Sequence, residues 1–366
     1  MIVYADNLSK KDVKYIWKTC FPEDTDEFID FYFNAKYKNE NTLIYLLEGK
    51  AVACLQMLPY AMTFYGKHIP TAYISGAATL PQYQNKGIMK ELLVYAFHEM
   101  KKRKISLSTL IPQENWLIRF YEKLNYTPAF DYSEEKLSYK NQNNATKNYN
   151  TQISILTSKG LKEAYQFYTL QNSKRNLCIQ KSFHDFKAIY TSFQLDNGNI
   201  FIALQNNTIQ GLCFAIRQDS LISIKEMLCT DSTIEKIFLQ EITLHYNCKH
   251  ILRQKPANNH QNLFSKGMAR ILIPQTLLQL YAAAHPHISI IVSIHDKDIA
   301  QNKENYYINN GQCYSINPHQ LPDNQSPYEL DIRQLTKLLL GYPLEDSETI
   351  FKQFTRAHPY MSLMLE

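Results

Sequence analysis

The sequence predicts an α/β (α+β) fold in which a mixed, mostly antiparallel sheet occurs twice and a smaller α/β section follows. Three observations carry this prediction. Three apolar or alternating segments with turns between them fill residues 42–80, which is typical of meandering antiparallel strands. A small-residue strand, a loop around one glycine and a long amphipathic helix follow one another at 74–100. The order strand, strand, strand, helix returns more faintly at 199–246.

The first section, residues 1–140, is expected to contain the better-defined copy of this sheet. The helix that starts after Gly87 places Met89, Leu92, Leu93, Ala96, Phe97 and Met100 on one face. The segment 129–139 is expected to close the sheet. The other expected strands are 2–5, 42–48, 51–65, 69–80 and 105–111, and the other helices are 10–21, 26–37 and 116–125.

Two further sections follow a polar segment at 140–150 that is typical of a linker. In the second section, 151–268, the strand-to-helix junction has no glycine and places Asp231 and Glu235 at the helix start, where carboxylates repel a pyrophosphate. We therefore expect this copy not to bind a phosphate ligand. The third section, 269–366, is expected to contain helices 274–285, 331–342 and 347–356, strands 288–296 and 305–316 around an Asn310-Gly311 turn, and an apolar tail docked against another surface.

Composition excludes several classes of protein. The net charge of +5 is small for 366 residues, and the one tight basic cluster, 101–104, ends a predicted helix, so nucleic-acid binding is not expected. The seven cysteines form no CxxC pair, and the N-terminus does not resemble a signal peptide, which together indicate a cytoplasmic location. Prolines interrupt the most apolar stretch, at 271–294, so no membrane span is expected. His285, His287, His295 and Asp296 lack a metal-ligand spacing, so no metal is expected.

The junction between the strand and helix at 74–100 predicts an anion site. A strand that delivers free backbone amides into a helix N-terminus favours phosphate through those amides and the helix dipole. The strand itself contains four small residues, Ser75 to Ala78, that allow a ligand to approach the backbone. An ordinary turn at Gly87, and close packing of Gly76 against a neighbouring helix, are the alternative explanations.

The loop from Thr79 to Met89 resembles the coenzyme A loop of the GNAT superfamily of N-acetyltransferases, whose pattern is (Arg/Gln)-x-x-Gly-x-(Gly/Ala). Gln84 matches the first position and Gly87 the fourth, whereas Met89 stands where the pattern has a small residue. The resemblance implies that acetyl-CoA is the co-substrate. It assigns the pyrophosphate to the backbone of the loop and the pantetheine arm to the strand, with an amide near Thr79 or Leu80 polarising the acetyl carbonyl. The implied cofactor-binding residues are Ala77, Ala78, Thr79, Leu80, Gln84, Asn85, Lys86, Gly87, Ile88, Met89 and Asn115.

The segment from Asn115 to Tyr126 resembles a late helix of the same family. There the asparagine contacts the cofactor, and the tyrosine, here Tyr121, donates a proton to the departing thiolate. A phenol with a pKa of about 10 is protonated at pH 7 and can supply that proton. By itself, Tyr121 is one of 26 tyrosines on an amphipathic helix, and only its order and separation from the loop favour the functional role.

The three-section layout resembles the enhanced-intracellular-survival type of N-acetyltransferase. That resemblance implies a sterol-carrier-like domain at 269–366, a homo-oligomer, commonly a hexamer, and amine substrates that include aminoglycosides. It also implies that the α-carboxylate of Glu366 is the catalytic base. A base is needed because holding an alkyl amine neutral at pH 7 costs about 4–5 kcal/mol. A tail that only packs is the alternative for 359–366.

Two functions from different classes follow. The first is an acetyl-CoA-dependent N-acetyltransferase that acts by direct attack on a primary amine of a small molecule or peptide. The second is a non-catalytic protein that binds acyl-CoA or another ligand. A weaker third possibility makes 269–366 a lipid carrier, with the rest of the chain as its scaffold.

Overall fold

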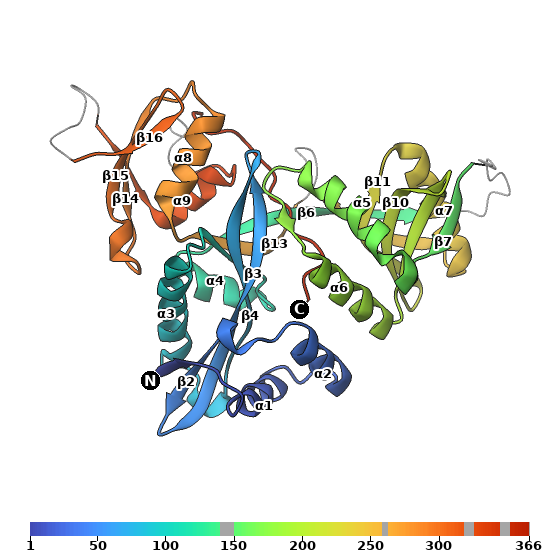
Figure 1. Ribbon diagram of the computed structural model, residues 1–366, viewed down its shortest axis with the longest axis horizontal. Helices are drawn as coiled ribbons and strands as arrows, with labels where there is room; N and C mark the ends of the chain where they lie inside the picture. The colour runs from blue at the N-terminus through green and yellow to red at the C-terminus, as the bar shows by residue number, and fades with distance from the viewer. Residues whose placement is uncertain (140–149, 258–262, 318–325, 345–351, 366) are drawn as a thin grey trace. The chain divides into compact units, whose positions relative to one another are not determined.

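The computed structural model describes residues 1–139, 150–257, 263–317, 326–344 and 352–365 (Figure 1). Backbone contacts group the chain into two compact units. The first unit joins Met1–Phe130 to Lys266–Pro359, and the second joins Asp131–Ser265 to Tyr360–Glu366. Each unit is described by itself.

The large sheet of the first unit has the strand order β1-β2-β3-β4-β5-β13. Strands β1 to β4 pair in antiparallel fashion, and helix α3 crosses over so that β5 runs parallel to β4. The expected meander at 42–80 is therefore confirmed. The elements are β1 Ile2–Tyr4, α1 Lys10–Cys20, α2 Asp26–Ala35, β2 Thr42–Leu47, β3 Lys50–Phe64, β4 Lys67–Thr79, α3 Ile88–Lys102, β5 Leu107–Leu110, α4 Asn115–Glu122 and β13 Phe264–Ile271.

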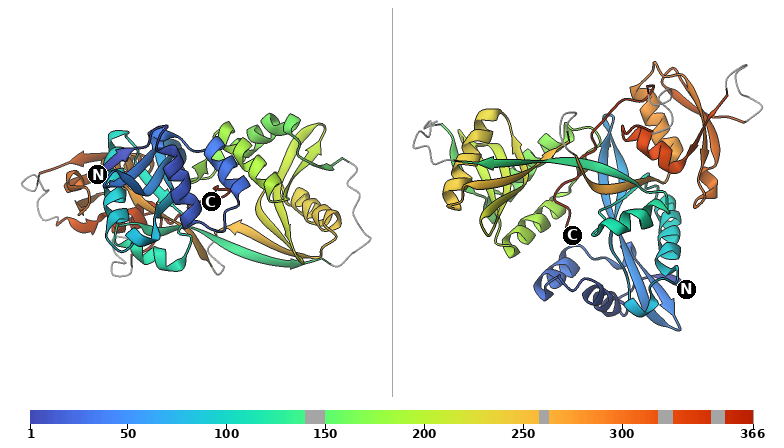
Figure 2. Two further views of the ribbon diagram at one scale, coloured as in Figure 1. Left: turned by 90° about the horizontal axis from the view of Figure 1, so that it is seen from below. Right: turned by 180° about the vertical axis from the view of Figure 1, so that it is seen from behind.

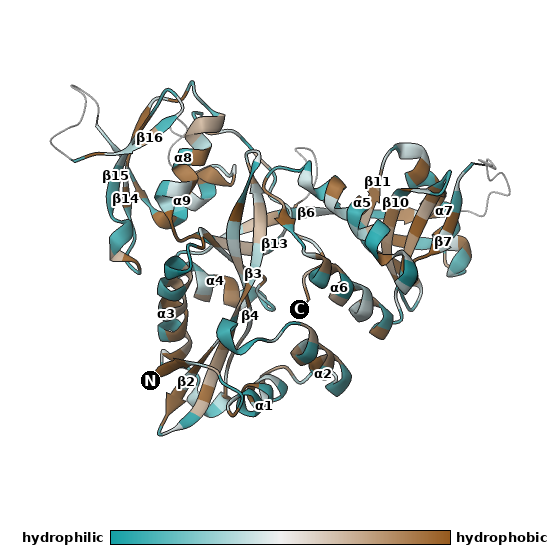
Figure 3. Cartoon of the chain, viewed as in Figure 1, coloured by the Kyte–Doolittle hydropathy of each residue, from teal (hydrophilic) through white to brown (hydrophobic). Residues whose placement is uncertain are grey.

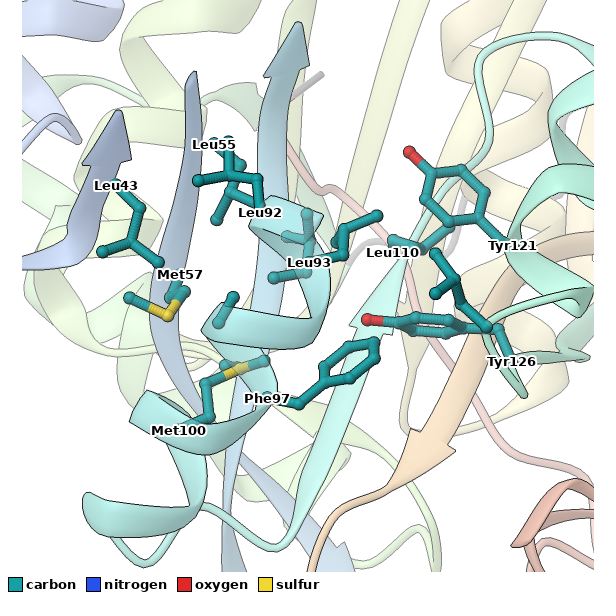
Figure 4. Close-up of a cluster of buried hydrophobic side chains, with 14 of the residues drawn as sticks. Leu43, Leu55, Met57, Leu92, Leu93, Phe97, Met100, Leu110, Tyr121 and Tyr126 are labelled. Atoms are coloured by element: carbon teal, nitrogen blue, oxygen red, sulfur yellow. The ribbon is translucent and has the colours of Figure 1, made fainter. Parts of the chain in front are cut away.

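Helices cover both faces of this sheet, with α1 and α2 on one face and α3 on the other (Figures 1 and 2). Helix α3 carries both polar and apolar residues, as its amphipathic pattern requires (Figure 3). Its apolar side packs on the strands, where Leu92, Leu93 and Phe97 are fully buried (Figure 4). This packing fixes the N-terminus of α3 at the end of β4.

The strand that follows β5 in the sheet comes from a distant part of the sequence. β13 pairs antiparallel with β5, from Met268 opposite Leu110 to Ile271 opposite Leu107. β6 (Thr127–Ser138) follows β13 in the strand order, so the expected strand at 129–139 does belong to this sheet, although its neighbour there is β13 and not β5. Its residues Tyr132 to Ser138 pair with β12 (His250–Pro256). Alternation along each segment indicates a strand but not its partner, so the sequence alone could not assign this pairing.

Gly76 on β4 has no room for a side chain. A Cβ atom built there would lie 2.3 Å from Cζ3 of Trp17 on α1, and the backbone has φ = +56°. We expect Gly76→Ala to lower the free energy of unfolding by about 2–4 kcal/mol through overpacking and backbone strain. Gly49→Ala, at φ = +78° with open space around it, is the matched control and should cost only about 1 kcal/mol. Equal losses of stability in denaturant titrations would contradict the packing explanation.

The third section has a small sheet of its own with the order β16-β15-β14-β17. The expected turn is confirmed, since Asn310 and Gly311 both have positive φ between the paired ends of β15 and β16. Half of the expected helix 347–356 lies outside the described residues, and the described half, 352–356, is not helical. The three-domain division stays a prediction. The elements are α8 Pro274–Ala284, β14 Ile290–His295, β15 Glu304–Asn309, β16 Gln312–Ser315, β17 Tyr328–Asp331 and α9 Ile332–Leu339.

The second unit repeats the crossover of the first. Its strands have the order β6-β12-β11-β10-β9-β7, and α7 crosses over so that β12 runs parallel to β11, as β5 does to β4. Residues 360–365 of the tail are buried, and Tyr360 donates its hydroxyl to Glu226 at 2.7 Å. The remaining elements are β7 Gln152–Ile155, α5 Leu161–Ser173, β8 Ile179–Gln180, α6 Phe183–Leu195, β9 Asn199–Gln205, β10 Thr208–Gln218, β11 Leu221–Cys229 and α7 Ser232–His245.

Candidate active site

The N-terminus of α3 presents backbone amides without a side-chain acceptor. Gly87 occupies the N-cap position at φ = +80°, and within the described chain no side chain caps the helix. The first hydrogen bond of the helix runs from the Glu91 amide to the Gly87 carbonyl, so the amides of residues 88–90 precede it. A Cβ atom added to Gly87 would meet no atom within 4 Å. The glycine therefore provides both the left-handed conformation and open space in front of the amides, which suits an anion.

The N-terminus of the corresponding helix in the second unit, α7, is capped by the carboxylate of Asp231. Asp231 is the N-cap of α7, and its Oδ1 accepts from the amides of Thr233 at 2.7 Å and Ile234 at 3.0 Å. Glu235, one turn later, accepts from Arg253 at 2.6 Å. These contacts occupy the amides that remain open in α3, as the acidic junction in the sequence predicts.

The loop between β4 and α3 folds back on the end of the strand. Residues Pro81–Tyr83 form a short 3-10 turn, and Asn85 has φ = +61°. The side-chain amide of Gln84 donates to the Thr79 carbonyl at 3.1 Å, and the Lys86 ammonium lies 5.3 Å from the centre of the Tyr83 ring. Gln84 thus ties the loop to the end of the strand, while the ammonium of Lys86 lies against the Tyr83 ring.

A β-bulge interrupts β4 just before the loop. Ser75 pairs with Gln56 and Ala78 with Cys54, so Gly76 and Ala77 together stand opposite Leu55. A bulge leaves one more backbone amide on its strand than the neighbouring strand can pair. The Leu80 amide, by contrast, donates to the Val52 carbonyl at 3.0 Å. The bulge is therefore better placed than Leu80 to polarise a carbonyl group.

Tyr121 combines a buried ring with an unengaged hydroxyl. It sits on α4 and is 7% exposed, and its ring centre lies 5.1 Å from that of Phe120 and 5.7 Å from that of Tyr126. In the part of the chain that the structure describes, its hydroxyl has no hydrogen-bond partner, and it points away from Tyr126 (Figure 4). Loss of hydration on burial raises the pKa of Tyr121 to about 12. The phenol is therefore neutral at pH 7 and its proton is free to be donated.

One pocket of about 230 Å³ brings the loop, the bulge and α4 together. Of the predicted site residues, Ala78, Leu80, Lys86 and Asn115 do not line it: the first two are buried, and the last two are exposed. Glu366 lies outside the described residues. The predicted residues that do line the pocket are Ala77, Thr79, Gln84, Asn85, Gly87, Ile88, Met89 and Tyr121.

Five further lining residues are absent from the prediction: Tyr83, Lys90, Trp116, Leu117 and Phe120. Leu117 lies four residues before Tyr121, so helical periodicity alone could have placed it on the same face, whereas Phe120 is adjacent to Tyr121 and periodicity does not place it there. Trp116 is 62% exposed, and its indole N–H donates to Glu114 at 2.6 Å. No sequence pattern distinguishes that tryptophan from an ordinary surface residue.

The described residues contain neither a group of metal ligands nor a membrane-spanning helix. Nowhere among them do three histidine, cysteine or acidic side chains gather closely enough to hold a metal ion. None of the helices described is both long and apolar enough to cross a membrane.

Comparisons with known proteins agree with this geometry. Residues 5–129 match the family model described as an acetyltransferase (GNAT) domain, whereas no curated protein matches the chain. A GCN5-related N-acetyltransferase from Anabaena variabilis has a similar structure, with a TM-score of 0.79 and 15% identity over 98% of each chain. Eis1 from Mycobacterium abscessus has a TM-score of 0.76 and 11% identity, over 100% of this chain and 99% of its own. A GCN5-related N-acetyltransferase from Kribbella flavida has a TM-score of 0.74 and 14% identity, over 100% and 97%. At such identities the likeness concerns the fold.

Proposed function

We propose, starting from the GNAT acetyltransferase domain that residues 5–129 match, that this protein is an acetyl-CoA-dependent N-acetyltransferase. It would transfer the acetyl group to a primary amine of a small molecule or peptide, including aminoglycoside-like amines, by direct attack. The observation that carries the proposal is the shared pocket. The open N-terminus of α3, the bulge residue Ala77 and the free phenol of Tyr121 all face the same space.

Each part of the pocket has a role in this reaction. The amides at the start of α3 would hold the pyrophosphate, and the bulge on β4 would polarise the thioester carbonyl. The amine nitrogen forms a bond to the carbonyl carbon, the carbon–sulfur bond breaks, and Tyr121 gives its proton to the leaving sulfur. The nitrogen then loses a proton to solvent, and the Tyr121 phenolate regains one from solvent. Burial raises the pKa of the coenzyme A thiol as it raises that of the Tyr121 phenol. Proton transfer from Tyr121 to the leaving sulfur is therefore feasible inside the pocket.

The amine must lose a proton before it attacks. We propose the α-carboxylate of Glu366 as the base, on the basis of the family resemblance. Adding residues after Glu366 should then lower kcat at least about tenfold, because the base is lost and general base catalysis is typically worth 10²–10⁴-fold. The same extension placed before Met1 is the control and should leave kcat unchanged. Equal rates for both extended proteins would rule out the terminal carboxylate while sparing the fold.

A thiol-release assay with acetyl-CoA tests the proposed function. The protein would carry a free C-terminus, and the acceptors would be aminoglycosides, polyamines, amino acids and peptides. Thiol release that depends on one acceptor would establish the enzyme and its substrate class. No release above hydrolysis with any acceptor would contradict the proposal.

A second candidate is a non-catalytic acyl-CoA-binding protein. It is favoured by Met89, whose side chain lines the pocket where the family pattern has a small residue. Calorimetric binding of coenzyme A, together with silence in the thiol-release assay, would support this alternative.

The resemblance also motivates three broader proposals. These are a sterol-carrier-like domain at 269–366, a homo-oligomer that is a hexamer, and a cytoplasmic location in line with seven cysteines that form no disulfide. Sedimentation velocity tests the oligomeric state directly.

A further inference from the structure

A buried ion-pair cluster lies between β13 and the loop that follows β14. The Arg270 guanidinium is fully buried and donates to Asp296 at 2.9 and 3.2 Å. Asp298 stands 3.6 Å from the same guanidinium nitrogen, with its side chain 7% exposed. The backbone amides of Asp298 and Ile299 also donate to Asp296. A buried guanidinium and carboxylate pair to offset their loss of hydration, so these contacts hold the loop against β13.

The cluster reaches the turn that follows α4. The side-chain amide of Asn125, which is 9% exposed, donates to Asp298 at 2.8 Å. Next to it, Arg333 on α9 donates to Glu122 at 2.5 Å, and this ion pair is about one-third exposed. Two separate parts of the third section therefore contact the last residue of α4 and the turn that follows this helix.

The same cluster also contacts α3. The Arg270 guanidinium lies 4.4 Å from the centre of the Phe97 ring. Asn302, which donates to Asp296 at 2.9 Å, accepts from the Lys101 ammonium at 2.7 Å. Helix α3 and the turn after α4 thus both contact the same cluster of side chains.

We propose that this group of contacts, formed by Arg270, Asp296, Asp298, Asn302 and Arg333, is a brace that positions Tyr121 against the N-terminus of α3. The inference rests on the proposed function, and its members are positioning residues. Tyr121 directly precedes Glu122, and its carbonyl accepts from the amides of Leu124 at 2.9 Å and Tyr126 at 3.1 Å. Any shift of the braced turn is therefore transmitted to Tyr121. A displacement of about 1 Å at a reacting group can cost about 100-fold in rate.

Paired substitutions at Asp298 separate positioning from stability. Asp298→Asn keeps an oxygen that can accept from Asn125, whereas Asp298→Ala removes it. Both variants lose the charge beside Arg270, and Asp298→Ala also leaves the buried Asn125 amide without an acceptor, so both should lower the melting temperature, Asp298→Ala by more. The two kcat values are compared well below both melting temperatures. Asp298→Ala should lower kcat about tenfold, with the KM for acetyl-CoA changed less than about twofold, while Asp298→Asn should stay within about twofold of the wild type. Equal kcat values for the two variants would overturn the brace.

The ion pair between Arg333 and Glu122 allows an independent test. Arg333→Met should lower kcat about fivefold, and Arg333→Lys, which keeps the charge, should restore most of it. Lys14→Met, which removes an exposed ion pair with Asp30 at α1 and α2, is the matched control and should leave kcat unchanged.

Hydrogen exchange provides a measurement that does not depend on activity. The amides of residues 115–122 should exchange about tenfold faster in Asp298→Ala and Arg333→Met than in the wild type, while those of α1 stay unchanged. Unchanged exchange in α4 would overturn the brace even if kcat fell. If the wild type transfers no acetyl group, the proposed function fails, and faster exchange confined to α4 would still support the brace.

Discussion

Replacing Tyr121 by phenylalanine is expected to lower kcat at least about 100-fold and to change the KM for acetyl-CoA less than about twofold. The substitution removes the proton that the leaving thiolate needs, and general acid catalysis is worth about 10²–10⁴-fold. The ring contacts with Phe120 and Tyr126 remain. The lost hydroxyl has no hydrogen-bond partner among the described residues, so stability should change little. Steady-state kinetics and thermal unfolding measure the two effects.

Tyr126→Phe is the matched control. Tyr126 is five residues further along and fully buried, but its hydroxyl pairs with Ser108 at 2.6 Å. Removing that hydroxyl leaves a buried serine unpaired, which should cost about 1–3 kcal/mol of stability without lowering kcat. A similar kcat in Tyr121→Phe and Tyr126→Phe would rule out Tyr121 as the acid.

The pH dependence of turnover gives the same prediction a second measurement. Burial raises the pKa of Tyr121 to about 12 from its usual 10.0. The rate should therefore rise with pH as the amine loses its proton, with no falling limb from Tyr121 below a pH of about 11. Tyr121 also affects stability. Because its pKa is raised in the folded state, its contribution to the free energy of unfolding is complete below pH 10 and is lost as the pH rises through about 12.

Replacing Gly87 by aspartate is expected to weaken coenzyme A binding more than about 100-fold. The new carboxylate would stand before the open amides of α3, as Asp231 does in α7. A carboxylate about 5 Å from a phosphate costs about 3 kcal/mol per charge pair at an effective dielectric constant of about 20. Calorimetry with coenzyme A measures the loss directly.

Gly66→Asp controls for backbone strain. Gly66 has the same φ of +80° as Gly87, and an added Cβ would likewise meet no atom within 4 Å. It lies in the turn between β3 and β4 and does not line the pocket. Both variants should lose similar stability, and only Gly87→Asp should lose affinity. Coenzyme A binding to Gly87→Asp with wild-type affinity would contradict the assignment of the anion site.

Local features of the site could be predicted from the sequence because each depends on neighbouring residues. Gly87 marks a left-handed turn, and the apolar spacing of residues 89–100 sets the buried face of α3. The sequence also predicts that the N-terminal amides of α7 are capped and those of α3 are not. Asp231 stands at the start of α7, and a helix cap is a hydrogen bond between neighbouring residues.

Features that depend on distant residues could not be predicted. Gly76 could be explained by ligand approach or by helix packing, and only the position of Trp17 shows how closely α1 packs there. A bulge can be predicted where it breaks the alternation of apolar and polar residues. The run of small residues around Gly76 and Ala77 has no such alternation, so the sequence gives no sign of the bulge. Trp116 lines the pocket because of where α4 lies, which depends on contacts with residues about 170–210 positions later in the chain.

The pairing of β13 with β5 bears on how much of the chain folds by itself. The family match ends at residue 129, but the hydrophobic core around α3 also includes Met268, Leu272 and Ile299. A protein that ended after α4 would leave β5 as an open edge strand and expose part of this core, a combination that favours aggregation. The segment that carries the family pattern is therefore shorter than the smallest piece that should be expressed alone. Within this unit, β13 completes the acetyltransferase-like fold, although it lies more than 130 residues after the end of the family match.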